Sequence, residues 1–258
     1  MPELPEVEIY KLYLDQSGLL GKRFRDYRIH GKSLRYHHNM PTTPQGTIQN
    51  ITRHGKAIYM SLSNNYYFKI HLGMSGKIRV LPTSDLILRS HDHIEIMFDG
   101  LSIVYNDTRR FGYVTYTKSP YVCQGIDGLA YIKPDYFSDL CAKTGLSIRN
   151  LLMNQNHISG LGNIYVQEVL FKAKILPRRP ANSLTSTEIN KILCYIPTIL
   201  NAAIQASGST IATFTTPNGT QGGFKPAIYG RHHCSECQAH VIKVKAQQPI
   251  YYCPCCQK

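Results

Sequence analysis

The chain has 258 residues, 43% of them hydrophobic, which is enough for one large domain or two modest ones with buried cores. Lys and Arg total 29 against 16 Asp and Glu, and the formal charge of +13 suits a polyanionic partner. A membrane protein is excluded because no run of about 18 apolar residues occurs, and the acidic N-terminal segment is unlike a signal peptide, so we expect a soluble, intracellular protein, nuclear or cytoplasmic according to its source.

The chain begins MPELPEVE. An initiator methionine in front of a small residue such as proline is usually removed, and Pro2 would then carry a free secondary amine. Such an amine can attack an electrophilic carbon, and it forms an iminium ion with an aldehyde. The alternative is that Pro2 has no chemical role, and these two residues alone favour it. The helical spacing of Val7, Tyr10 and Leu14 predicts a helix from Glu6 to about Leu14.

Short runs rich in Ile, Val, Tyr and Phe follow, from about residue 20 to 118, and Gly, Asn, Asp or Pro separates most of them. Asn65 and Gly100 end dipeptides that are typical of hairpin turns. The pattern predicts an antiparallel sandwich or barrel. The runs include FRDYRIH, AIYMSL, YYFKIHL, GKIRV, HIEIMF, LSIVY and GYVTY.

Three loops of this region carry residues that suit nucleic acid. Lys56 precedes a strand in RHGKAIY, Met74 lies in HLGMSG, and DTRRFG carries Arg109 and Phe111. Apolar wedges and arginines can fill the gap that a base leaves in a duplex. The alternative places Met74 and Phe111 in the core.

The pattern becomes helical after Pro120. The segment SIRNLLMNQNHISGLGNIYVQEVLFKAKI predicts a helix, a glycine turn and a second helix, and Asn163 opens the second helix, where free N–H groups can bind an anion. A plain packing turn is the alternative. A capping box from Thr185 to Glu188 predicts a third helix. Residues 207–221, rich in Gly, Thr and Ser, are expected to form a mobile loop.

The last segment carries a paired cysteine motif. Cys234-x-x-Cys237 and Cys253-x-x-Cys256 are separated by fifteen residues, the spacing of a tetrahedral zinc site with a hairpin between two knuckles. Four thiolates leave no open position, so one structural Zn²⁺ is predicted. Cys255 is a less suitable ligand than Cys256 because a spacer of two residues fits a knuckle better.

Six of these motifs occur in the order found in formamidopyrimidine-DNA glycosylase and endonuclease VIII, the Fpg/Nei family of base-excision repair enzymes, which the chain resembles over nearly its whole length. The resemblance implies an α+β fold: an N-terminal antiparallel β-sandwich flanked by helices, a helix–two-turn–helix domain and a C-terminal zinc-finger β-hairpin. The expected boundaries are 1–125, 126–222 and 223–258. The motifs are MPELPEVE, GKAIY, HLGMSG, DTRRFG, GLGNIYVQEVLFKAKILP and the C-terminal cysteine segment.

The resemblance gives Pro2 a chemical role. Pro2 corresponds to the nucleophile that attacks C1′ of the sugar and forms a Schiff base, after which β,δ-elimination cuts the strand. An α-amino group has a pKa of about 8, so a usable fraction is neutral near pH 7. Glu3 corresponds to the acid/base, Glu6 to a helper that handles protons or places the amine, and Lys56 to a lysine that contacts phosphate.

The resemblance also implies DNA contacts. The expected void-filling residues are Met74, Arg109 and Phe111. Asn163 corresponds to a phosphate-binding asparagine, and Gln248 stands where the family usually has a phosphate-binding arginine, a loss of charge that Lys243 or Lys245 would have to offset. Weaker assignments are Glu168 as a second carboxylate and His71 and Tyr229 as DNA contacts.

We therefore expect a bifunctional DNA glycosylase/AP lyase. Because the 207–221 loop lacks a clear match to the Fpg pattern, the sequence favours oxidised pyrimidines. Fpg-type specificity for 8-oxoguanine and formamidopyrimidine is the alternative, and an inactive nucleic-acid-binding zinc protein is another; a tautomerase with an N-terminal proline is remote. The expected partner of the monomeric chain is double-stranded DNA with oxidised bases or abasic sites, with single-stranded DNA as a second form and no membrane.

Overall fold

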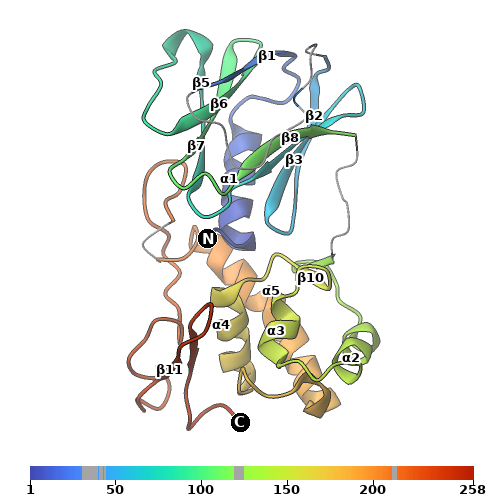
Figure 1. Ribbon diagram of the computed structural model, residues 1–258, viewed down its shortest axis with the longest axis vertical. Coiled ribbons are helices and arrows are strands. Elements are labelled where there is room, and N and C mark those ends of the chain that lie inside the picture. The colour runs from blue at the N-terminus through green and yellow to red at the C-terminus, as the bar shows by residue number, and fades with distance from the viewer. Residues whose placement is uncertain (31–39, 41–42, 44, 119–124, 211–213) are drawn as a thin grey trace. The chain divides into compact units, whose positions relative to one another are not determined.

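The computed structural model describes residues 1–30, 40, 43, 45–118, 125–210 and 214–258. The chain divides into two compact units, one of Met1–Val122 with Ile211–Gly222 and one of Cys123–Thr210 with Gly223–Lys258. Figure 1 shows the elements of both units. Among the described helices, none is long and apolar enough to cross a membrane.

The described residues of the first unit form one long helix and two antiparallel four-stranded sheets, ordered β1-β6-β7-β5 and β2-β3-β4-β8. Both expected hairpin turns are present, since Asn65 and Gly100 have φ values of 62° and 74°, which suit tight turns. The elements are α1 (Leu4–Gln16), β1 (Phe24–Ile29), β2 (Ile48–His54), β3 (Ala57–Leu62), β4 (Tyr67–His71), β5 (Gly76–Pro82), β6 (Asp92–Phe98), β7 (Leu101–Asp107) and β8 (Tyr113–Thr117).

One hydrophobic core joins α1 to both sheets. Tyr10 of α1, Phe24 of β1 and Phe68 of β4 belong to it, and the rings of Phe24 and Phe68 meet edge to face at 4.9 Å. This edge-to-face packing across the two sheets is favourable for aromatic pairs. The arrangement is a sandwich, so the sandwich prediction is confirmed. Phe214 of the 207–221 segment also packs on Tyr10, with ring centroids 6.3 Å apart; residues 211–213 of the expected mobile loop lie outside the described residues.

The second unit is helical and ends in a small hairpin. The expected helix–turn–helix is present as α3 and α4, and Thr185 and Glu188 form the expected capping box at the start of α5. Phe171 of α4 packs into a core with Val241 of the hairpin segment. The elements are β9 (Ile126–Asp127), α2 (Pro134–Ala142), α3 (Ile148–Met153), β10 (Ile158–Ser159), α4 (Asn163–Ala173), α5 (Ser186–Gln205), β11 (Ile242–Val244) and β12 (Ile250–Tyr252).

Candidate active site

The start of α1 fixes the first residues of the chain. The helix begins at Leu4 rather than at the predicted Glu6, because Glu3 caps it and the Glu6 Oε2 atom accepts the Glu3 backbone N–H at 2.9 Å. Pro2, Glu3 and Glu6 are all buried. The capping bond holds the backbone directly after Pro2, which supports a positioning role for Glu6.

Lys56 lies in the two-residue turn between β2 and β3. The turn is tied to α1 because Arg53 Nε donates to Glu8 Oε2 at 2.6 Å, and Arg53 Nη1 donates to the Gly55 carbonyl at 3.2 Å. The Arg53 side chain is only 6% exposed, so this ion pair is screened little by solvent. The pair therefore holds the turn that carries Lys56 against α1.

The charges of this region act on one another. Burial lowers the pKa of the chain's amino group, which Met1 carries in this structure; the Glu3 and Glu6 carboxylates oppose the shift, and Lys56 and Arg109 add to it. Burial likewise lowers the pKa of Lys56 against the pull of the same two carboxylates. A lowered amine pKa raises the neutral, nucleophilic fraction near pH 7. The structure thus brings these four charged groups into one electrostatic cluster with the amine.

Two loops of the first unit meet at glycines. Gly73 has a φ of 60°, which favours glycine. A Cβ atom at this position would also lie 2.3 Å from the Gly112 nitrogen, so no side chain fits there. The loops carry Met74 on one side and Arg109 with Phe111 on the other. The Arg109 guanidinium carbon lies 5.0 Å from the centre of the Phe111 ring. The predicted void-filling residues therefore lie on adjoining loops, and Met74 and Phe111 are only partly buried.

Asp107 holds these two loops together, and sequence reasoning missed it although it opens the DTRRFG motif. Its fully buried carboxylate accepts the Ser75 hydroxyl, the Arg109 backbone N–H at 3.1 Å and the Gly112 backbone N–H at 2.8 Å. Among the described residues, no ion pair involves Asp107, so hydrogen bonds alone satisfy its charge. Asp107 is a positioning residue for the loops.

Asp107→Asn is expected to destabilise the fold by about 1 to 3 kcal/mol, because the amide NH₂ would face backbone donors in a buried site. Urea unfolding followed by circular dichroism measures the change. Asp99→Asn is the matched control, since the Asp99 side chain is 40% exposed and pairs with Arg25 on the surface. Equal stability losses for the two variants would contradict the role of Asp107 in holding the two loops together.

His71 is neutral near pH 7. Burial lowers its pKa to about 4, with smaller contributions from Lys56 and Lys69. Its Nδ1 atom accepts the Gly73 N–H at 3.0 Å, which requires an unprotonated Nδ1, and its ring stacks on Tyr113 at 5.2 Å. Its place beside the Met74 loop suits the expected DNA contact, which stays a prediction.

The pKa of His71 gives the protein a pH-dependent stability. The His71 ring takes up a proton near pH 6.5 in the unfolded chain but only near pH 4 in the folded chain. The contribution of the neutral ring to the unfolding free energy is therefore complete above about pH 6.5 and is lost as the pH falls to about 4. We expect the unfolding free energy of His71→Gln to rise less steeply over this window, by up to about 1.4 kcal/mol per pH unit. Urea titrations at several pH values measure the two slopes, and parallel slopes would contradict the assignment.

Asn163 connects α4 to the hairpin segment in the second unit. The residue is buried, its Nδ2 donates to the Pro249 carbonyl at 3.0 Å, and its Oδ1 accepts Arg149 Nη2 at 2.6 Å and Gln167 Nε2 at 2.7 Å. The structure thereby brings Asn163 next to the segment that carries the exposed Gln248. Sequence reasoning missed Arg149, although it is the one basic residue in the run IRNLLM.

Glu168 has a structural use within the second unit. Its buried carboxylate accepts the backbone N–H groups of Ala227, Ile228 and Tyr229 at 2.6, 3.0 and 2.9 Å. Burial raises the pKa of Glu168, and these three donors oppose the rise. The carboxylate therefore anchors the chain ahead of the zinc hairpin; its role near the reaction, and that of Tyr229 on DNA, stay predictions.

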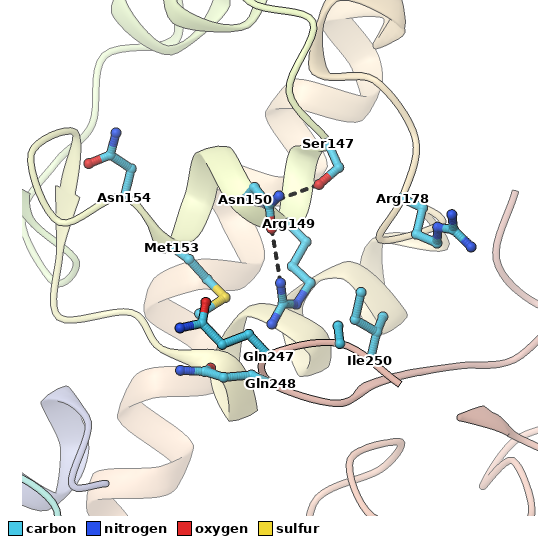
Figure 2. Close-up of a pocket in the computed structure, with 10 residues that line it drawn as sticks. Ser147, Arg149, Asn150, Met153, Asn154, Arg178, Gln247, Gln248 and Ile250 are labelled. Carbon is cyan, nitrogen blue, oxygen red and sulfur yellow. Dashed lines mark hydrogen bonds between the residues drawn. The ribbon is translucent and has the colours of Figure 1, made fainter. Parts of the chain in front are cut away.

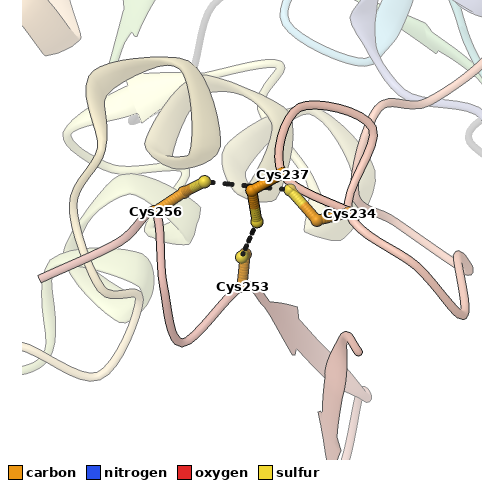
Figure 3. Close-up of side chains that lie close together, drawn as sticks. All are labelled: Cys234, Cys237, Cys253 and Cys256. Atoms are coloured by element: carbon orange, nitrogen blue, oxygen red, sulfur yellow. Dashed lines mark hydrogen bonds between the residues drawn. The ribbon is translucent and has the colours of Figure 1, made fainter. Parts of the chain in front are cut away.

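The four predicted zinc ligands converge at the base of the hairpin (Figure 3). Their sulfur atoms all lie within 4.8 Å of one another. The Cys234–Cys256 and Cys237–Cys253 sulfur pairs are 3.9 and 3.4 Å apart, and a tetrahedral ZnS₄ centre has sulfur edges of about 3.8 Å. All four are free cysteines and Cys255 stays outside the cluster. The donor set fits a structural Zn²⁺, so the zinc prediction is confirmed.

Two family models match the chain. Residues 1–114 match the formamidopyrimidine-DNA glycosylase N-terminal domain, and residues 128–215 match its H2TH domain. The proteins named formamidopyrimidine-DNA glycosylase from Hydrogenovibrio crunogenus and Dichelobacter nodosus are each 35% identical to this chain, cover all of it, and are themselves covered over 97% and 100% of their lengths.

Solved structures of similar fold belong to the same family. A Lactococcus lactis Fpg variant in complex with Fapy-dG-containing DNA has a TM-score of 0.87, 29% identity and full coverage of both chains. The MutM (Fpg) protein of Thermus thermophilus has a TM-score of 0.87 and 30% identity over 99% of this chain and 98% of its own. With two family models covering most of its length and relatives matched end to end, this chain belongs to the Fpg family of DNA glycosylases with AP lyase activity.

Proposed function

We propose that the chain releases oxidised purines, 8-oxoguanine and formamidopyrimidines, from DNA before it cuts the strand. The relatives named above are called formamidopyrimidine-DNA glycosylase, and the L. lactis protein is bound to DNA that contains Fapy-dG. These names support the Fpg-type alternative over the oxidised pyrimidines that the sequence favoured. The preference for oxidised pyrimidines depended on the 207–221 loop alone, whereas the similarity to the named relatives extends over the whole chain.

The observation that carries the mechanism is the cluster of the chain's amine with Glu3, Glu6 and Lys56. In the proposed first step, the Pro2 nitrogen, freed by removal of Met1, attacks C1′ of the damaged nucleotide. A bond forms between that nitrogen and C1′, the bond from C1′ to the base breaks, and the base leaves with a proton. The buried Glu3 carboxyl beside Pro2 moves protons at the sugar.

The Pro2 nitrogen then loses its proton, and the sugar-ring bond from C1′ to O4′ breaks as O4′ takes up a proton, which leaves an iminium ion between the nitrogen and C1′. Positive charge on the Pro2 nitrogen makes the C2′ proton acidic; its removal expels the 3′ phosphate, and a second elimination expels the 5′ phosphate. Lys56, held by the Arg53–Glu8 pair, has a place beside the amine where it can bind one of these phosphates. The capping bond from Glu3 to Glu6 keeps the nucleophile in position.

We assign the DNA partner to both units. An L. lactis Fpg structure with abasic-site DNA, at a TM-score of 0.85 and 29% identity over 99% of both chains, supports this assignment. Extruding a base costs a few kcal/mol, and Met74, Arg109 and Phe111 would fill the gap. Asn163 and the zinc hairpin would bind the backbone. The boundaries 1–125, 126–222 and 223–258 stand as the proposed limits of these parts.

The specificity is tested with matched duplexes that differ in one base. Single-turnover release of 8-oxoguanine and formamidopyrimidine is compared with release of thymine glycol in the same sequence context. We expect faster release of the two purine lesions. Faster release of thymine glycol would overturn the purine assignment, and release of none would favour a binding protein without catalysis.

A further inference from the structure

A pocket of about 670 Å³ lies in the second unit, between α3 and the segment before β12 (Figure 2). Arg149 and Asn154 line it on the helical side, and Gln247 and Gln248 line it on the hairpin side. The exposed Arg178 also lines it. None of its lining residues is acidic, so the pocket has a positive potential.

Arg149 is the unusual member of this pocket. The residue is only 6% exposed, yet its hydrogen-bond partners are the neutral side chains of Asn163 and Asn150. No carboxylate among the described residues pairs with it. A guanidinium has five N–H donors, and three of them donate to the two asparagines, which leaves two. Burial lowers the pKa of Arg149, as expected for a cation held without an anion.

Burying a charged group without a counter-ion costs folding free energy. A bound anion that neutralises the group would offset this cost. Figure 2 shows the Arg149 side chain pointing from α3 toward the hairpin segment with Gln247 and Gln248. An anion seated there would meet the two remaining guanidinium donors and the side-chain amides of the glutamines. Tetrahedral oxyanions suit such donors, and arginine binds phosphate with two parallel bonds.

The family resemblance already implies a phosphate contact at Asn163 and at position 248; we propose that Arg149 supplies the positive charge that Gln248 lacks and binds that backbone phosphate of the DNA substrate. The proposal rests on the proposed function, since it concerns the same DNA. Asn163 holds the guanidinium through two hydrogen bonds and also binds the Pro249 carbonyl, so one side chain orients the cation and fixes the hairpin wall. Arg149, rather than Lys243 or Lys245, is thus the compensating cation; neither lysine lines the pocket.

The test is the salt dependence of DNA binding. Affinity for a duplex with a tetrahydrofuran abasic analogue is measured by fluorescence anisotropy from low to moderate KCl. We expect Arg149→Gln to weaken binding about tenfold and to reduce the magnitude of the slope of log K against log salt by about 0.9, the value for one phosphate contact. Arg149→Lys should keep the slope. Lys191→Gln, an exposed charge loss on α5, is the matched control and should leave both values unchanged.

A second variant keeps the test valid if Arg149→Gln does not fold. Gln248 is exposed, so the Gln248→Glu variant should fold. The new carboxylate would form an ion pair with the Arg149 guanidinium and repel phosphate. The slope should again fall by about 0.9, whereas Gln205→Glu, exposed at the end of α5, should not change it. In the double variant with Arg149→Gln, the losses should not add, because both act on one phosphate.

Two outcomes would overturn the inference. One is a wild-type slope in both Arg149→Gln and Gln248→Glu. The other is that inorganic phosphate raises the melting temperature of the wild type but not of the variants, while the salt slopes of DNA binding are the same for all of them. That result would make the pocket a site for free phosphate rather than for DNA. Base release is measured on the same preparations. Equal slopes with intact release refute only the pocket, whereas a wild type that releases no base refutes the proposed function.

Discussion

A chain that retains Met1 ahead of Pro2 is expected to bind abasic DNA normally and to release almost no damaged base. The blocked nitrogen of Pro2 would be an amide, whose lone pair is delocalised, so it cannot attack C1′ or form an iminium ion. We expect the single-turnover rate to fall by at least about 10³-fold, because the covalent route is lost entirely. Inserting a leucine between Met1 and Pro2 supplies such a chain, because methionine ahead of a large residue is kept and Pro2 stays in an amide bond, and mass spectrometry checks its first residue.

The control is the processed wild-type chain, whose mass should lack the methionine. Lys56 and Arg109 stay in place in the blocked chain, so affinity for the tetrahydrofuran duplex should change less than about threefold, a difference below 1 kcal/mol. Undiminished base release by a preparation that is wholly blocked would contradict the role of Pro2.

Loss of zinc is expected to unfold the hairpin and abolish tight DNA binding. The hairpin has little core of its own: Cys234 and Cys253 themselves form part of it, together with Phe171 and Val241. A structural Zn²⁺ contributes about 10 kcal/mol or more to the folding of such a module. Cys253→Ser should therefore bind no zinc, melt at a lower temperature and bind DNA at least about 100-fold more weakly, since the Asn163–Pro249 contact would be lost with it.

Cys255→Ser is the matched control for the zinc prediction. Cys255 is exposed and lies beside the cluster without belonging to it. Zinc content by colorimetric release, thermal melting and DNA affinity should all match the wild type. A Cys255→Ser protein that loses its metal, or a Cys253→Ser protein that keeps it, would contradict the ligand set.

The sequence predicted the elements whose signal is local. Apolar alternation and turn residues revealed most strands of the sandwich, and the capping box revealed α5. The elements that escaped include β2 (Ile48–His54), an edge strand whose residues are mostly polar or exposed, and α2 (Pro134–Ala142), whose short run buries only Phe137 and Cys141. Neither carries enough periodic burial to stand out, so only tertiary packing defines them.

The residues of the candidate site likewise divide into those that the sequence indicated and those that it did not. Spacing indicated the zinc cysteines, because a tetrahedral thiolate site demands that pattern, whereas the roles of Pro2 and Glu3 came from the family resemblance. The supporting residues did not show in the sequence, since their role depends on partners far along the chain. Asp107 acts through Ser75, and Arg149 through Asn163. Lesion choice was the weakest inference because it depended on one loop.

The most direct test of the mechanism is borohydride trapping on an 8-oxoguanine duplex. Borohydride reduces an iminium ion to a stable amine, so the Schiff base of an active enzyme becomes a permanent crosslink. We expect one crosslinked protein per DNA, with the sugar remnant on the N-terminal peptide at Pro2 after digestion. A crosslink that maps to Lys56 or another lysine, or full strand cleavage without any crosslink, would contradict it.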